Sequence, residues 1–320
     1  MENYVFVGLS LLVLSIVYLK LAERFNIIDK PNHRSSHVTP TIRGGGVLFY
    51  IAILIFYVTS GYQYSYFVLG VSLIAIVSFI DDIVMLSSTI RLPFQFVAIA
   101  LCLFQIGCTL DDIFIVIPLL IFGVGFINIY NFMDGINGIT GLYSGVVLLG
   151  FYSINSQEHI INDDLILYSL LALVVFGFYN FKRKARMFAG DIGSITIAVL
   201  IFFIGITLFN QMKSPLLILL VAVYGADTIL TIIYRKSIGE RLTQPHRHHI
   251  YQKSVHVLRA SHLKVSLVYS GLQLLINVVV FFNYQQSLFY QYILIGIISL
   301  ILATLYVYMF RLVEQKGGNN

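Results

Sequence analysis

Residues 128–139 read NIYNFMDGINGI and lie between two apolar runs, each close to the length of a membrane span. Four polar residues recur in this stretch at intervals of three: Asn128, Asn131, Asp134 and Asn137. The spacing places the first three side chains along one helical face, and the following glycines allow the backbone to turn and to approach a ligand. Amides that pack helices together in a bundle are the alternative interpretation. The stretch therefore predicts a polar turn between two membrane spans.

The composition is that of a membrane protein. The 320-residue chain is 58% hydrophobic and 11% charged, with a mean hydropathy of +0.87, whereas soluble domains are about 25% charged. Apolar runs that approach the roughly 20 residues needed to cross a bilayer centre near residues 4–22, 44–59, 66–80, 93–107, 113–131, 135–152, 165–181, 192–209, 215–234, 264–283 and 288–310. We expect an all-α integral membrane protein of 10 or 11 transmembrane helices, with residues 1–320 as one polytopic domain.

The basic residues predict the orientation of the chain. When successive loops are assigned to alternate sides, nineteen of the twenty Lys and Arg residues fall on one side, and Lys213 is the exception. An excess of basic residues marks cytoplasmic loops, so we expect the N-terminus outside and the C-terminus in the cytoplasm. The cytoplasmic loops are then about 23–43, 81–92, 132–135, 182–191 and 235–263. The basic residues of these loops account for the isoelectric point of about 9.0. Attraction of the loops to anionic lipid headgroups explains this excess of basic residues without a nucleic-acid partner.

Four aspartates lie at the cytoplasmic ends of spans, among apolar residues: Asp81, Asp82, Asp134 and Asp191. An ionisable residue at a membrane span indicates a functional site by default. The adjacent Asp81 and Asp82 repel each other, which favours a nearby cation or a raised pKa. In MFAGDIGSIT, Asp191 begins a span, where free backbone N–H groups suit a phosphate. A simple helix N-cap is the alternative for Asp191.

Two cytoplasmic segments supply cations. TQPHRHHIYQK contains His246, Arg247, His248 and His249, and DKPNHRSSHVTPTIRGGG contains Lys30, His33, Arg34, His37 and Arg43. A zinc site is one reading of the histidine run, but no cysteine or further ligand spacing supports it. Anion recognition fits better, because Arg and Lys bind phosphates. The two segments predict a phosphate-binding face.

Carboxylates, basic loops and amides on one membrane face suit phosphorylated substrates with a divalent metal. Mg²⁺ typically takes one or two carboxylates and leaves its other positions to water and phosphates. One substrate would arrive from the bilayer and the other, a soluble nucleotide conjugate, from the cytoplasm. A lipid or sugar-phosphate transporter and an intramembrane aspartyl protease are the rival classes. Asp227, inside the ninth run, favours the transporter, whereas the loop-edge aspartates disfavour a protease that needs a deeply buried carboxyl pair.

Six motifs carry a family resemblance from Asp29 through Gln252. In order they are DKPNHRSSHVTPTIRGGG, FIDD followed by RLPFQ, NIYNFMDGINGI, FAGDIGS, GADTILTIIYR and HRHHIYQ. The chain resembles the polyprenyl-phosphate N-acetylhexosamine-1-phosphate transferases, the WecA-, TagO- and MraY-like enzymes of glycosyltransferase family 4. The resemblance implies an active site on the cytoplasmic face of a multi-pass protein of the bacterial cytoplasmic membrane.

The implied reaction is that of a Mg²⁺-dependent phosphoglycosyltransferase, with Mn²⁺ as a substitute metal. It would transfer a HexNAc-1-phosphate from a UDP-sugar to undecaprenyl phosphate and release UMP. The lipid-linked product would initiate a cell-surface polysaccharide such as an O-antigen of lipopolysaccharide or a capsule. Membrane lipids are further expected partners, nucleic acid is not, and a homodimer is compatible with the resemblance.

The resemblance also implies roles for individual residues. Asp81 and Asp82 match paired catalytic aspartates, one of which acts on the lipid phosphate, and Asp191 and Asp82 are the implied metal ligands. The implied nucleotide-binding residues are Asn128, Asn131, Asp134 and Asn137. The implied phosphate- and sugar-binding residues are His246, Arg247, His249, Arg43 and Arg91. Lys30, Arg34 and His37 are expected to bind the lipid phosphate or to be structural.

Two departures from the family pattern bear on the donor sugar. Asn137 stands where many GlcNAc-specific members have an aspartate, and the chain reads His249-Ile250-Tyr251-Gln252 where they often read His-Ile-His-His. These variants resemble the subgroup that uses 6-deoxy amino sugars. We therefore expect UDP-FucNAc or a UDP-QuiNAc derivative as donor, with UDP-GlcNAc as the alternative.

Overall fold

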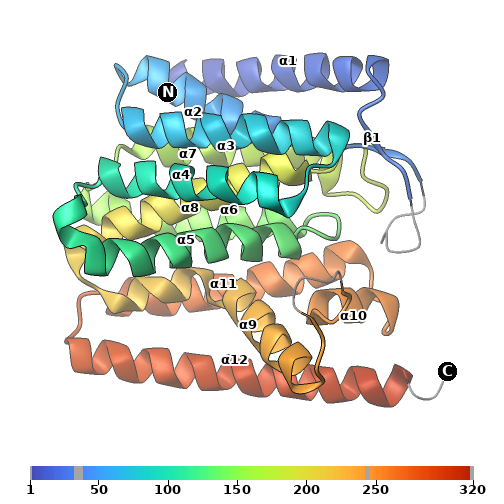
Figure 1. The fold of residues 1–320 in the computed structure, drawn as a ribbon, viewed down its shortest axis with the longest axis vertical. Coiled ribbons are helices and arrows are strands. Elements are labelled where there is room, and N and C mark those ends of the chain that lie inside the picture. The colour runs from blue at the N-terminus through green and yellow to red at the C-terminus, as the bar shows by residue number, and fades with distance from the viewer. Residues whose placement is uncertain (1, 32–38, 242–245, 318–320) are drawn as a thin grey trace.

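The computed structural model describes residues 2–31, 39–241 and 246–317, and this part of the chain is almost entirely helical (Figure 1). The long helices are α1 (Glu2–Arg24), α2 (Val47–Thr59), α3 (Ser65–Val84), α4 (Ser88–Gln105), α5 (Ile113–Met133), α6 (Ile139–Glu158), α7 (Asp163–Asn180), α8 (Gly190–Met212), α9 (Ala222–Ser237), α11 (His262–Asn283) and α12 (Leu288–Gly317). The short elements are β1 (Ile28–Asp29), β2 (Thr41–Ile42), the 3₁₀ helices η1 (Leu110–Asp112) and η2 (Pro215–Val221), and α10 (Ile250–His256). The all-α membrane architecture is confirmed.

Each of the eleven predicted runs corresponds to one helix or to the η2–α9 pair. Within the described residues, nine segments are long and apolar enough to span a membrane. The other two predicted runs are α2, which has only 13 residues, and α6, whose polar face includes Thr140, Ser144 and Asn155. Because α6 is buried against α7 and α11, its polar residues face protein. The exact number of spans and their orientation stay predictions.

Helix α8 occupies the centre of the bundle. Most of its residues are buried, and it packs against α2, α3, α5 and α6. Its N-terminus approaches the start of α2 so closely that a side chain on Gly46 would overlap the backbone of Gly193. Small residues allow such contacts between membrane helices. The central helix therefore presents its N-terminus, with Asp191, to the segment that precedes α2.

The predicted run 215–234 is broken. It forms the 3₁₀ helix η2, followed by α9, which is inclined to its neighbours (Figure 1). Gln273 of α11 accepts a hydrogen bond from the Val223 backbone N–H at 3.1 Å and donates one to the Leu219 carbonyl at 2.8 Å. The Tyr143 hydroxyl accepts a hydrogen bond from the Tyr224 backbone N–H at 3.2 Å. These side chains satisfy backbone groups that a helix break exposes.

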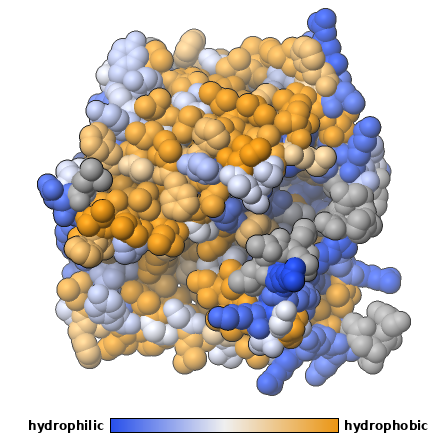
Figure 2. All heavy atoms as spheres, viewed as in Figure 1, coloured by the Kyte–Doolittle hydropathy of each residue, from blue (hydrophilic) through white to orange (hydrophobic). Residues whose placement is uncertain are grey.

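Five connecting segments meet at one end of the bundle. The strands β1 and β2 pair antiparallel there, and Ile42 forms a parallel bridge with Met187 in the segment that precedes α8. Figure 2 shows an apolar band over the helices, with strongly hydrophilic side chains gathered at the end where Figure 1 places β1 and α10. This end carries the predicted cytoplasmic loops.

Candidate active site

Three aspartates and two arginines form an ion cluster where α3, α4 and α8 meet the segment before α2. We call Asp81, Asp82, Asp191, Arg43 and Arg91 the Asp–Arg cluster. Arg43 contacts Asp82 at 2.7 Å and Asp191 at 3.1 Å, and Arg91 contacts Asp81 at 2.7 Å and Asp191 at 2.8 Å. Burial tends to lower the pKa of Arg43, but Asp82 and Asp191 raise it above its usual value. The predicted convergence of these acidic residues is present in the structure.

Asp82 is the most enclosed member of the Asp–Arg cluster. Its side chain is fully buried, and its carboxylate accepts hydrogen bonds from the backbone N–H groups of Asp191 at 2.8 Å and Ile192 at 3.1 Å. Gly190 has a φ of +73°, and a Cβ there would overlap the Asp82 carboxylate. Glycine at position 190 therefore lets a carboxylate of α3 dock onto the N-terminus of α8, where the helix dipole stabilises negative charge.

Beside the Asp–Arg cluster lies a cavity of about 290 Å³, which we call the polar pocket. It is lined by Asp29, Arg43, Asn131, Asp134, Gly135, Ile136, Asn137, Asn180, Phe188, Ala189, Gly190, Asp191, Gln252 and His262. A second cavity of about 530 Å³ shares Asn137, Phe188 and His262 with it and adds Arg183, Lys184 and Arg259. The two adjoining cavities offer carboxylates at one end and cations at the other.

Two residues of the polar turn, Asn131 and Asp134, point into the polar pocket. Asn131 accepts a hydrogen bond from the Ser194 hydroxyl at 3.0 Å, and Asp134 accepts one from the Thr140 hydroxyl at 2.6 Å. Burial raises the pKa of Asp134 to about 6, although the Thr140 hydrogen bond opposes the shift. Asp134 is therefore mostly ionised at neutral pH and becomes protonated in mildly acidic solution.

Asn137 lines the polar pocket and also holds the segment between α7 and α8. Its side-chain amide donates hydrogen bonds to the carbonyls of Lys182 at 3.0 Å and Arg183 at 3.3 Å. Asn180, the last residue of α7, also joins the polar turn to the segment before α8. Its side-chain carbonyl oxygen accepts a hydrogen bond from the Gly138 backbone N–H at 2.7 Å, and its side-chain amide donates one to the Met187 carbonyl at 2.9 Å. An aspartate at 137 could not donate these bonds, which gives the departure from the family pattern a structural reason.

Asn128 has a different environment from the other residues of its motif. It exchanges hydrogen bonds with Gln95 of α4, donating at 2.8 Å and accepting at 3.4 Å, and it donates to the Val124 carbonyl at 2.7 Å. It does not line the polar pocket. This arrangement corresponds to the alternative of an amide that packs helices together, and the predicted nucleotide contact of Asn128 stays a prediction.

The histidine segment, residues 246–249, is anchored to α9. His249 is buried and its Nδ1 lies 3.3 Å from Asp227, while His248 lies 2.9 Å from Glu240. Burial and, to a smaller extent, the neighbouring His249 and Arg235 lower the pKa of His246 to about 4. The residues that line the polar pocket do not include His246, Arg247 or His249, so their phosphate and sugar contacts stay predictions.

The motif HRHHIYQ nevertheless reaches the polar pocket through its last residues. Tyr251 is buried and its hydroxyl donates to the Phe132 carbonyl at 2.9 Å. Gly135 is required there, because a Cβ at this position would overlap the Tyr251 hydroxyl. Gln252, the next residue, lines the pocket. Of the two residues that replace histidines of the family pattern, Tyr251 therefore holds the polar turn and Gln252 lines the pocket.

Asp227 accepts hydrogen bonds from the Tyr269 hydroxyl at 2.6 Å, the Ile250 backbone N–H at 3.1 Å and the Thr231 hydroxyl at 3.2 Å. With His249 these give the carboxylate four partners. Such a satisfied buried carboxylate is typical of a structural anchor. The transporter alternative rested on Asp227, and these contacts account for the residue without transport.

The remaining predicted residues are Lys30, Arg34 and His37. Lys30 follows β1 and is exposed, and Arg34 and His37 lie outside the described residues. Sequence reasoning missed Asp29, Asn180, Phe188, Gln252 and His262 as lining residues. Asn180 could have been noticed as an amide at the predicted cytoplasmic end of a span, two residues before the basic run KRKAR.

The donor groups are compatible with one divalent cation. The Asp–Arg cluster has three carboxylates and two guanidinium groups, which leaves one acidic group in excess. Asp191 and Asp134 both line the polar pocket, and Mg²⁺ needs only one or two carboxylates when phosphates supply further oxygens. Over the described residues, however, no three metal-ligating side chains are grouped as a metal site. The role of Asp82 as a metal ligand stays a prediction.

Comparison with known proteins agrees with this arrangement. Residues 64–209 match the sequence model of the family described as Glycosyl transferase family 4. The chain is similar to the decaprenyl-phosphate N-acetylglucosaminephosphotransferase of Mycolicibacterium smegmatis, with 27% identity over 78% of this chain and 73% of that protein. It is also similar to the phospho-N-acetylmuramoyl-pentapeptide-transferases of Streptococcus gordonii (31% identity) and Streptococcus mutans (30% identity).

The streptococcal matches are partial: they cover 39% and 43% of this chain and the same shares of those proteins. The family match contains α3, most of α8 and the polar turn, and thus Asp81, Asp82, Asp134 and Asp191. Residues 64–209 are therefore similar to the glycosyl transferase family 4 domain, and the four aspartates of this region lie in or beside the polar pocket.

Proposed function

We propose that this protein transfers a HexNAc-1-phosphate from a UDP-activated amino sugar to a polyprenyl phosphate, with undecaprenyl phosphate as the expected acceptor. The acceptor phosphate oxygen forms the new phosphorus–oxygen bond to the β-phosphorus of the donor, the donor's diphosphate bond breaks, and UMP leaves. The product is a lipid-linked diphosphate sugar that initiates a cell-surface polysaccharide. Relatives named as phosphotransferases of this kind support the proposal.

The observation that carries the proposal is the junction between the Asp–Arg cluster and the polar pocket. Phosphoryl transfer depends mainly on positioning and on neutralising charge. Arg43 and Asp191 belong to both the cluster and the pocket, so anionic phosphates and a cation would meet at these residues. The acceptor phosphate is already an anion, and the reaction therefore needs no strong base.

Mg²⁺ is the proposed cofactor, and Asp191 is the residue best placed to hold it, with Asp134 and the Asn131 amide nearby in the pocket lining. When bound, the ion would neutralise phosphate charge and orient the diphosphate. Asp82 positions Asp191, because it binds the backbone N–H groups at the start of α8. Arg43 and Arg91 hold the Asp191 carboxylate from both sides.

The donor is proposed to extend through the two adjoining cavities, which share Asn137, Phe188 and His262. Two donor classes follow from different observations. The residues at positions 137 and 250–252 favour a 6-deoxy amino sugar such as UDP-FucNAc or a UDP-QuiNAc derivative. The names of the relatives that match 78% of the chain favour UDP-GlcNAc.

The test is UMP release by the purified protein in detergent, with undecaprenyl phosphate and a panel of UDP-N-acetyl sugars. We expect release that needs both substrates and stops when EDTA removes Mg²⁺. The preferred sugar decides between the two donor classes. If no donor gives UMP, the proposal is wrong. Substrate uptake by liposomes would then support the transporter, and cleavage of a membrane peptide would support the protease.

A further inference from the structure

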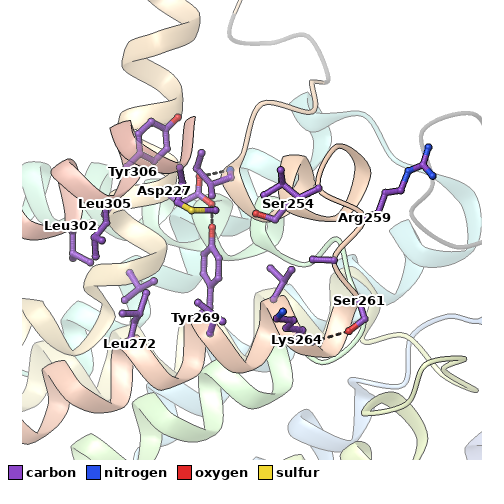
Figure 3. Close-up of a pocket in the computed structure, with 18 residues that line it drawn as sticks. Asp227, Ser254, Arg259, Ser261, Lys264, Tyr269, Leu272, Leu302, Leu305 and Tyr306 are labelled. Atoms are coloured by element: carbon purple, nitrogen blue, oxygen red, sulfur yellow. Dashed lines mark hydrogen bonds between the residues drawn. The ribbon is translucent and has the colours of Figure 1, made fainter. Parts of the chain in front are cut away.

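A third cavity of about 540 Å³ lies apart from the polar pocket, among α9, α10, α11 and α12 (Figure 3). Its volume is within the range of ligand pockets, roughly 300–1,000 Å³. It shares no lining residue with the polar pocket. We call it the α11–α12 cavity.

The cavity exists because two consecutive helices do not close against each other. Helix α12 packs mainly on α9, η2 and α10, whereas α11 packs mainly on α6 and η2. Leu272 of α11 and Leu302 and Leu305 of α12 form apolar walls (Figure 3). Few residues of α12 are buried in the protein, so this helix lies at the periphery. Gaps between peripheral membrane helices are filled by lipid chains, because proteins tolerate few voids and the bilayer core holds no water.

The end of the cavity at the α10–α11 turn is basic. Arg259, Ser261 and Lys264 lie together on this side, opposite the leucines of α12 (Figure 3). Asp227 is the acidic residue in the lining, and its carboxylate already has four hydrogen-bond partners. The two positive charges of Arg259 and Lys264 exceed the single negative charge of Asp227, so the net charge of the cavity lining is positive. An apolar slot with a basic end complements a lipid whose headgroup is anionic.

We propose that the α11–α12 cavity binds a bilayer phospholipid with an anionic headgroup, its acyl chain between α9, α11 and α12 and its phosphate beside Lys264. The bound lipid completes the packing of α12 against the bundle. Arg259 and Ser261 also line the second cavity, but Lys264 and Leu302 line neither that cavity nor the polar pocket. The proposal rests on these two residues and therefore does not depend on the transferase reaction.

The test uses the full-length chain, reconstituted in nanodiscs that contain equal amounts of phosphatidylglycerol and phosphatidylcholine. After extraction into mild detergent, native mass spectrometry counts the retained lipids. We expect phosphatidylglycerol to be retained in preference to phosphatidylcholine. Lys264→Gln should lower the retention of phosphatidylglycerol about fivefold, since one basic residue near a headgroup contributes on this scale.

Lys316→Gln is the matched control. Lys316 lies in the last turn of α12 and does not line the cavity, so this variant should retain lipid like the original protein. Leu302→Trp, which fills the apolar wall, should abolish retention of the lipid that Lys264 recognises. Equal retention of the two phospholipids, or an unchanged Lys264→Gln variant, would overturn the proposal. If added undecaprenyl phosphate displaced phosphatidylglycerol at equal concentration, the cavity would be an acceptor site instead.

Discussion

The Asp–Arg cluster and the Asp227 anchor both use buried carboxylates at the same end of the bundle, but their partners differ. In the cluster, each guanidinium group is shared by two carboxylates from different helices. At the anchor, one carboxylate collects a histidine, a tyrosine, a threonine and a backbone N–H. Ion pairs that involve the partly exposed side chains of Arg43 and Arg91 can be exchanged for ligand contacts, whereas a buried carboxylate saturated with hydrogen bonds fixes its neighbours.

This difference indicates a role in the reaction for the Asp–Arg cluster and a structural role for the Asp227 anchor. The Asp–Arg cluster reaches the polar pocket through Arg43 and Asp191. The anchor lies on α9 and holds His249 and the start of α10, which in turn places Tyr251 and Gln252 beside the polar turn. Changes in the cluster should therefore alter turnover, and changes at the anchor should alter stability.

The largest expected effect is on turnover in Asp191→Asn. This substitution removes the charge that we propose binds the cation and phosphates, and loss of one such electrostatic group typically costs about 10²–10³-fold in rate. UMP release at saturating substrate measures the change. The unfolding temperature should stay close to that of the original protein. A variant with near-normal turnover would remove Asp191 from the site.

The second effect is on stability in Asp227→Asn. The substituted amide has one oxygen in place of two, so at least one of the four buried donors loses its acceptor. Each such loss costs about 1–3 kcal/mol of unfolding free energy. Thermal unfolding in detergent should show a clear decrease, while Asp111→Asn in the exposed part of η1 should not. An unchanged unfolding temperature for Asp227→Asn would mean that Asp227 is not a structural anchor.

Much of the fold follows from local sequence. All eleven apolar runs became helices, because their composition suits the bilayer whatever their neighbours are. The break between η2 and α9 could not be predicted this way. It depends on Gln273 and Tyr143, which belong to distant segments and supply the hydrogen bonds that the broken backbone needs.

The candidate site likewise has features that follow from local sequence and features that depend on distant residues. Convergence of Asp81, Asp82 and Asp191 followed from placing every motif on one membrane face. The three-residue spacing could not distinguish Asn128 from Asn131, because Gln95, 33 positions earlier, decides which amide is used for packing. Asn180 and Phe188 were missed because their place in the pocket depends on how the segment before α8 folds back onto the polar turn.

The smallest expected effect is the pH dependence of stability caused by Asp134, a pocket residue outside both the cluster and the anchor. Its pKa is raised from 3.8 to about 6, so the folded protein holds this proton more tightly than the unfolded chain. The stabilisation is fully present below about pH 4 and is lost as the pH rises through 6. Asp134→Asn cannot titrate, so its unfolding temperature should lack this decrease between pH 4 and pH 7.

Burial is the largest cause of the raised pKa of Asp134. A cation bound beside this buried carboxylate should change its pKa, which provides a second test. Bound Mg²⁺ would favour the ionised carboxylate and should lower the pKa of Asp134. The difference in pH dependence between the original protein and Asp134→Asn should therefore shrink when Mg²⁺ is present. His246 acts in the opposite direction, because its pKa is lowered from 6.5 to about 4 and stability therefore rises with pH in that range. This contribution is the same in both proteins and cancels when the original protein is compared with Asp134→Asn. Identical pH profiles for the original protein and Asp134→Asn without ligands would show that water reaches this carboxylate freely, and the polar pocket would then be more open than the contacts of Asp134 indicate.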